Sequence, residues 1–118
     1  MSERQIQRRI LLDLSDRGLF VWRNETGAAR SMDGKRVIRF GLPGSPDILG
    51  LAPGGRALGV EVKTATGKQR PDQAAFQKAF EAAGGLYILA RSPEEAIAAI
   101  FGSPASCSPS SLSAPSSP

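Results

Sequence analysis

The sequence predicts an α/β domain in which a mixed β-sheet is flanked by helices. Helical apolar stripes and short segments rich in β-forming residues follow one another in the order α-β-β-β-β-α-β-α. The length of 118 residues corresponds to one domain. Every charged residue precedes position 103, and the remainder is mostly serine, proline and alanine. We therefore expect one folded domain over residues 1–102 and a disordered Ser/Pro-rich tail over residues 103–118.

The first helix is expected over residues 2–17. Ser2 and Gln5 have the three-residue spacing of a capping box, and Gly18 supplies a stop signal. Apolar residues recur at helical spacing, which predicts one buried face formed by Ile6, Ile10, Leu11 and Leu14.

The middle of the chain is expected to form four strands, over residues 19–23, 36–40, 46–51 and 57–63. Between the first two, a loop over residues 24–35 is expected, and it contains the turn signal Asp33-Gly34. The last of the four strands begins with Ala57, Leu58 and Gly59, which look buried on both faces, and it is expected to lie centrally in the sheet.

The remaining elements are a helix, a strand and a helix. Pro71 suits the first turn of a helix over residues 71–83, which a pair of glycines ends. A fifth strand follows over residues 86–90. Ser92 is placed to cap a short closing helix over residues 92–101.

Composition excludes several kinds of site. The chain has no histidine, and its single cysteine, Cys107, lies in the tail, so imidazole-based and thiolate-based sites are excluded from the domain. The charged N-terminus lacks a signal-peptide apolar region, and no apolar run is long enough to span a membrane. We expect a cytoplasmic protein. The net charge of +4 and the pI of about 9.8 are compatible with a polyanionic partner.

Four polar residues occur where burial is expected, and each has a structural alternative. Glu3 falls in the apolar stripe of the first helix, although it could instead complement the helix dipole from an exposed first turn. Glu61 and Lys63 share one face of the central strand, as a buried ion pair or as a site. Gln73 shares a helix face with two phenylalanines, although an exposed amide at a helix start would also explain it.

Asp47 lies at the start of a strand, and thirteen residues separate it from Glu61, so the two acids can meet at the ends of neighbouring strands. Glu3 can join them from a helix packed on the sheet. Carboxylates that converge repel one another, and a divalent cation removes this conflict. Oxygen ligands, including the Val62 carbonyl, suit Mg²⁺ or Mn²⁺. Lys63 could then orient a metal-bound water or stabilise charge on a phosphate.

Pro46-Asp47 followed by Glu61-Val62-Lys63 is the signature of the PD-(D/E)XK nuclease superfamily, which this sequence resembles. The longer motifs are similar to those of the virus-type replication-repair nuclease (VRR-NUC) domain, over about residues 3–100. They are "RNETG", "GLPGSPDILG", "EVKTATGKQRPDQAAF" and "AGGLYILARSPEEA".

The resemblance implies a restriction-endonuclease-like core and metal-dependent hydrolysis of phosphodiester bonds. It assigns metal-binding and catalytic roles to Glu3, Asp47, Glu61 and Lys63, and places Gln73 at the edge of the site. It also implies a homodimer from phage or bacteria that cuts branched DNA such as four-way (Holliday) junctions, or a DNA-repair enzyme. We further expect DNA contacts from Arg23, Asn24, Lys68 and Arg70.

Two alternatives use the same residues. The protein could be a nuclease without structure preference, such as a nickase or a partner-dependent subunit. It could also be a non-catalytic DNA-binding module in which Glu61 and Lys63 form a structural ion pair.

Overall fold

The computed structural model describes residues 1–102, apart from the side chain of Phe40. The tail predicted over residues 103–118 lies outside the described residues. Helix α1 (Glu3–Asp16) comes first, followed by strands β1 (Val21–Arg23), β2 (Gly27–Arg30), β3 (Val37–Phe40) and β4 (Ile48–Leu51). A 3₁₀ turn (Pro53–Gly55) leads to β5 (Ala57–Val62), α2 (Pro71–Ala82), β6 (Leu86–Ala90) and α3 (Pro93–Phe101).

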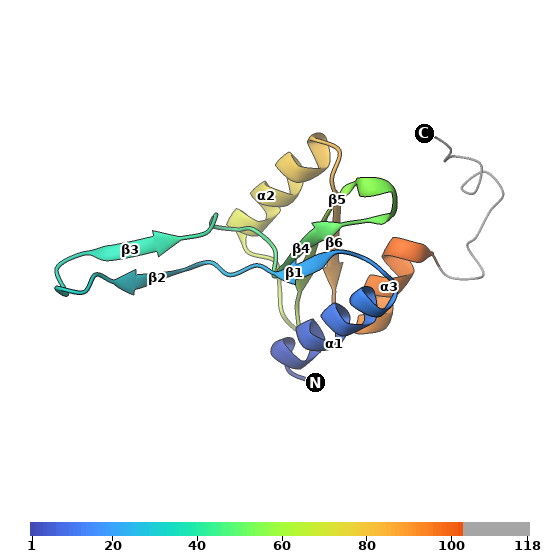
Figure 1. Cartoon of the computed structure of the whole chain (residues 1–118), viewed down its shortest axis with the longest axis horizontal. Helices are drawn as coiled ribbons and strands as arrows, with labels where there is room; N and C mark the ends of the chain where they lie inside the picture. Colours follow the sequence, from blue (N-terminus) through green and yellow to red (C-terminus); the bar gives the residue numbers. More distant parts are fainter. Residues whose placement is uncertain (103–118) are drawn as a thin grey trace.

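The main sheet has the strand order β1-β4-β5-β6. Strands β1 and β4 are antiparallel, as are β4 and β5, whereas β5 and β6 are parallel and connected through α2. Helices α1 and α3 lie together against one side of the sheet and α2 lies on the other side (Figure 1). The predicted fold class, a mixed sheet flanked by helices, is therefore confirmed.

The core lies between the sheet and the pair α1 and α3. The apolar stripe of α1 is buried as predicted at Ile6, Ile10 and Leu14. Alternate residues of β5 meet it, because Leu58, Val60 and Val62 are all fully buried in this cluster. The other face of β5 points toward α2, where a Cβ atom on Gly59 would lie 3.5 Å from the ring of Phe80. Glu61 belongs to this second face.

The ends of α1 and α3 are capped as the sequence predicts. Gln5 N donates to Ser2 Oγ at 3.2 Å, and Ser2 N donates to Gln5 Oε1 at 2.8 Å, which completes the capping box. Ser92 Oγ accepts a hydrogen bond from Glu95 N in α3. No helix within residues 1–102 is both long and apolar enough to cross a bilayer.

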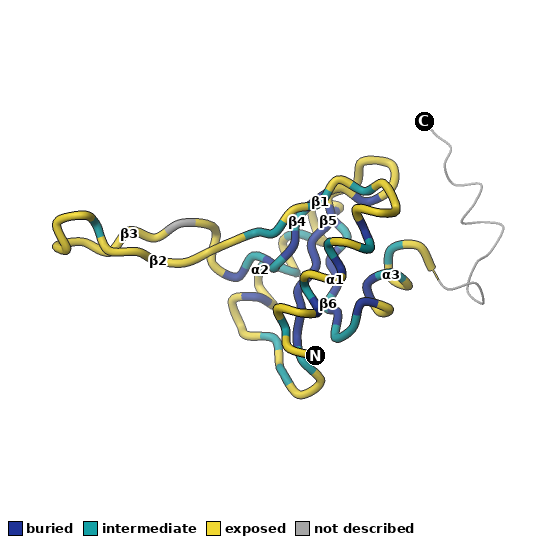
Figure 2. The backbone as a smooth tube through the Cα atoms, turned by 60° about the horizontal axis from the view of Figure 1, so that its bottom comes forward, coloured by how far each residue is buried: buried dark blue, intermediate teal, exposed yellow. Residues whose placement is uncertain are grey.

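The expected loop over residues 24–35 was wrong in part, because it contains strand β2. Strands β2 and β3 form a separate antiparallel hairpin, in which Gly27 pairs with Phe40 and Arg30 pairs with Val37. The hairpin projects from the main sheet, and its residues are almost all exposed (Figure 2). The segment Gly27–Arg30 has no β-branched or aromatic residue, so local propensity gave no strand signal. Pairing with β3 across the predicted turn at Gly34, whose φ is +73°, defines the strand instead.

Candidate active site

Strand register brings Asp47 and Glu61 side by side. Ile48 of β4 pairs with Val60 of β5 in antiparallel register. One position further along, Asp47 therefore lies opposite Glu61, and both side chains belong to the α2 side of the sheet. Asp47 Oδ2 accepts a hydrogen bond of 2.8 Å from Val62 N, which holds this carboxylate against β5 where the ladder ends.

Glu61 is 2 % exposed and only one of its two oxygens is satisfied. Gln73 Nε2 donates to Glu61 Oε2 at 2.7 Å, and Lys63 Nζ lies 3.6 Å from the same oxygen. Within the described residues, Glu61 Oε1 is buried without a hydrogen-bond partner. A buried carboxylate oxygen without a donor costs free energy, so this oxygen is suited to a ligand.

The pKa values of Glu61 and Asp47 also indicate a site suited to a cation. Burial, and then the neighbouring charge of Asp47, raises the pKa of Glu61 to about 7, although Lys63 and Arg70 oppose the shift. Burial also raises the pKa of Asp47, and this outweighs the hydrogen bond from Val62 and the charge of Lys63. The two acids therefore carry more negative charge than Lys63 alone neutralises, and a cation between them would relieve the conflict.

The residues present fit a hard divalent metal ion. Asp47 and Glu61 offer carboxylate oxygens, one of them without a partner, and these are the ligands that Mg²⁺ and Mn²⁺ prefer. Val62 directly follows Glu61 in the chain, and its carbonyl remains a predicted further ligand.

The expected meeting of three carboxylates is not seen. Among residues 1–102, no group of three or more acidic or cysteine side chains is arranged to hold a metal. Glu3 lies on the first turn of α1, which packs on the side of the sheet opposite to Glu61. Its role as a ligand stays a prediction.

Gln73 lies where the sequence placed it, at the edge of the site, and makes contacts in two directions. It is 4 % exposed on the first turn of α2. Its Nε2 donates to Glu61, while its Oε1 accepts a 2.8 Å hydrogen bond from Arg70 N. The side chain therefore orients the carboxylate and caps the helix at the same time, and the exposed-amide alternative does not describe it.

The four residues expected to contact DNA are placed differently. Lys68 and Arg70 are exposed in the segment before α2, and Arg70 Nε pairs with Asp72 Oδ1 at 3.2 Å. Arg23 pairs with Ile48 in the sheet, so strand alternation directs it away from the face of Asp47. Asn24 Nδ2 donates to Ser45 Oγ and Pro46 O, at 2.7 and 2.9 Å. Asn24 therefore braces the segment that leads to Asp47, a role the sequence did not predict.

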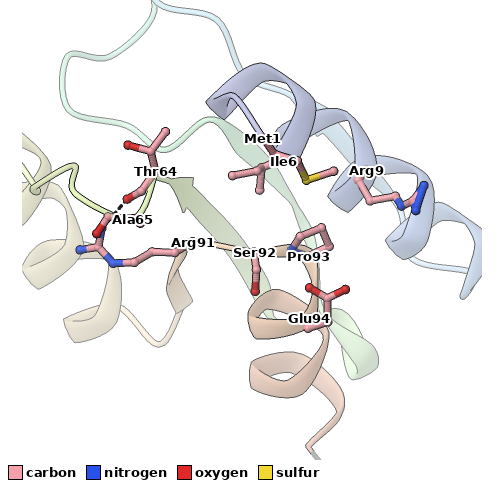
Figure 3. A pocket seen from close by; sticks show the side chains of 9 residues that line it. All are labelled: Met1, Ile6, Arg9, Thr64, Ala65, Arg91, Ser92, Pro93 and Glu94. Carbon is pink, nitrogen blue, oxygen red and sulfur yellow. Dashed lines mark hydrogen bonds between the residues drawn. The ribbon is translucent and has the colours of Figure 1, made fainter.

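The sequence also did not single out Arg91. Its Nη1 donates to Thr64 O at 2.6 Å and to Gly67 O at 2.7 Å, so it fixes the loop that follows Lys63. Arg91 lines a hollow of about 330 Å³ that also borders α1. Figure 3 shows the side chains around this hollow. Neither acid of the candidate site lines this hollow. No local pattern marks such a residue, because its partners are backbone carbonyls more than twenty positions away.

Comparison with known proteins gives one informative result. Neither a family model nor a curated protein matches the chain. A solved structure described as a VRR_NUC domain is similar, with a TM-score of 0.57 and 22% sequence identity, over 78% of this chain and 86% of that one. The chain therefore has the fold of a VRR-NUC domain, as the motifs in its sequence implied.

Proposed function

We propose that this protein is a divalent-metal-dependent DNA endonuclease that hydrolyses phosphodiester bonds. The observation that carries the proposal is the pair Asp47 and Glu61, in which Asp47 is half-buried and Glu61 is buried with one carboxylate oxygen left without a donor. The fold shared with a VRR_NUC domain supports the assignment of this pair to nuclease chemistry.

In this proposal Asp47, Glu61 and the Val62 carbonyl hold Mg²⁺ or Mn²⁺, and Glu3 completes or supports the site. The bound ion supplies Lewis acidity and lowers the pKa of a water molecule. Gln73 holds Glu61 Oε2, so that Oε1 is the oxygen presented for binding. The Lys63 ammonium stabilises charge on the phosphate or orients the attacking water.

We further propose a homodimer acting on branched DNA such as four-way junctions. Two active sites related by a two-fold axis suit the cutting of two strands. A second copy could cover apolar side chains of the edge strand β1 and its neighbour, because Phe20 is 69% exposed, Trp22 45% and Leu51 42%. Trp22→Glu is expected to shift the protein to monomers in analytical ultracentrifugation.

The test is cleavage of linear, nicked and four-way junction DNA with Mg²⁺ or Mn²⁺. Wild type should cut the junction, and Asp47→Asn should lower the rate by at least about a hundredfold. Asp16→Asn is the matched control, because Asp16 is exposed at the far end of α1, and it should cut at the wild-type rate.

Three other results of the cleavage assay would each contradict a specific part of the proposal. Equal cutting of all three DNAs would leave a nuclease without structure preference. No cleavage with either metal would favour the non-catalytic DNA-binding module. Similar rates for wild type and Asp47→Asn would remove Asp47 from the mechanism.

A further inference from the structure

The β2–β3 hairpin, residues 27–40, carries most of the net charge of the protein; we call it the arm. Within it are four cations, Arg30, Lys35, Arg36 and Arg39, and one carboxylate, Asp33, a net charge of +3. The rest of the chain holds eleven cations and ten carboxylates, so it contributes only +1 to the total of +4. The positive charge is thus concentrated on one projecting element.

The arm makes no contribution to the core cluster of the described residues. It extends away from the main sheet (Figure 1), and every residue of β2 is exposed. Val37 and Ile38 of β3 remain 55% and 47% exposed. An isolated two-stranded hairpin is marginally stable in water, so an arm of this kind is suited to ordering against a partner.

Register places two of the four cations on one face of the arm. Ala28 pairs with Arg39, and Arg30 pairs with Val37, so Arg30 and Arg39 point to the same side, with one residue pair between them. A strand rises about 3.4 Å per residue, so the two positions lie about 7 Å apart, roughly two base steps of B-DNA.

This face of the arm looks onto the start of α2. Ala28 and Arg39 line a hollow of about 450 Å³, together with Gly44 and Arg70. Gly44 packs closely against the backbone of Asp72 in the first turn of α2, where a Cβ atom would lie 2.4 Å from the carbonyl oxygen. Arg39 and Arg70, which belong to separate segments, therefore border one hollow, and Asp72, which is paired with Arg70 at 3.2 Å, lines it as well.

The base of the arm is fixed next to the candidate active site. One strand leaves it near Asn24, whose backbone N–H donates to Asp47 O at 2.8 Å. The other strand continues through the segment 41–46, which Asn24 also braces. A DNA phosphate bound at Asp47 and Glu61 would therefore have its flanking duplex beside the arm.

We propose that the arm grips duplex DNA outside the cut site, with Arg30 and Arg39 on phosphates of the flanking backbone. This inference rests on the DNA substrate of the proposed function. Contacts of this type are independent of base sequence and position the duplex. A second copy of the chain is the less suitable partner for this face, since two arms of net charge +3 repel each other.

The experiment measures binding of a 30-base-pair duplex by fluorescence anisotropy at 50 to 200 mM KCl, in EDTA so that no cleavage occurs. The logarithm of the binding constant falls linearly with the logarithm of the salt concentration. Each phosphate contact contributes about 0.9 to the magnitude of this slope, so the slope reports the number of contacts. Arg30→Ala/Arg39→Ala should reduce the slope by about two. Arg30→Lys/Arg39→Lys should keep it, because phosphate needs only the charge.

The matched control removes two exposed helix cations outside the arm, as Arg8→Ala/Lys78→Ala, and should leave the slope nearly unchanged. Circular dichroism should show every variant folded, since none of the altered residues belongs to the core. An equal fall of slope in the control and in the arm variant would mean diffuse attraction and would overturn the proposal.

The remaining outcomes separate the arm from the endonuclease activity. A slope unchanged in Arg30→Ala/Arg39→Ala overturns the arm proposal even if wild type cuts DNA. A slope reduced by about two supports it even if no DNA is ever cut. A changed sedimentation coefficient with an unchanged slope would make the arm a contact between copies, and would also overturn it.

Discussion

Raising the pH should destabilise the metal-free protein, because folding buries Glu61 beside Asp47. The folded-state pKa of Glu61 is about 7, against an ordinary value of 4.5. A raised pKa means that the folded state binds the proton more tightly than the unfolded state. The stabilisation by this group is therefore complete below about pH 4.5 and is lost as the pH rises through about 7. A shift of this size corresponds to about 3 kcal/mol.

The assay is urea denaturation in EDTA at several pH values between 4.5 and 8.5, for wild type and Glu61→Gln. Glutamine keeps the size of the side chain and removes its titration, so the difference between the two proteins isolates Glu61. That difference should change by about 3 kcal/mol in favour of the variant as the pH rises. Groups that do not interact with Glu61, such as the exposed Asp33 and Asp72, cancel in the difference, whereas the coupled titration of Asp47 remains part of it.

A difference that stays constant within about 0.5 kcal/mol over this pH range would refute the reasoning. It would mean that water reaches Glu61, or that Lys63 compensates its charge fully, and the electrostatic argument for a cation would then fail. A change of opposite sign would mean that Glu61 is ionised more easily in the folded protein than in the unfolded chain.

Three further predictions concern the surroundings of this pair. Mg²⁺ should stabilise the wild type, by about 2.7 kcal/mol at a hundred times its dissociation constant, and should stabilise Asp47→Asn much less, as thermal unfolding with and without the ion would show. Gln73→Ala removes the donor to Glu61 and should cost about 1–3 kcal/mol in urea denaturation at pH 8; no loss would mean that the hydrogen bond is unimportant. Gly44→Ala should destabilise the protein by more than about 2 kcal/mol, against about 1 kcal/mol for Gly54→Ala, because both have positive φ but only Gly44 packs against a backbone carbonyl. Equal unfolding midpoints for the two alanine variants would contradict this comparison.

The sequence predicted the sheet and the acidic pair because both depend on local patterns. Strand alternation and the thirteen residues between Asp47 and Glu61 are enough to bring two neighbouring strand ends together. The position of Gln73 follows in the same way from the first turn of a helix whose start Pro71 marks. Asp47, Glu61 and Gln73 are therefore positioned by contacts among three elements that follow one another in the chain, β4, β5 and α2.

What the sequence missed depends on contacts between distant segments. Strand β2 is defined by its partner β3 and not by its own residues. The role of Glu3 stays a prediction, because the side of the sheet on which α1 packs depends on the whole helix and not on residue spacing. The carbonyl partners of Arg91 lie 24 to 27 positions away. Every residue has a backbone carbonyl, so the sequence does not indicate which ones Arg91 contacts.

The two hydrogen bonds of Gln73 make its side chain directional. An amide has one donating and one accepting end, and here each end has the partner it needs, Glu61 on one side and the N–H of Arg70 on the other. If the Gln73 amide were flipped by 180°, its oxygen would face Glu61 Oε2 and its nitrogen would face the N–H of Arg70. Only one of the two amide orientations is therefore stable. A shift of the backbone at Arg70 would therefore also change the position of the Gln73 amide and, through it, the orientation of the Glu61 carboxylate.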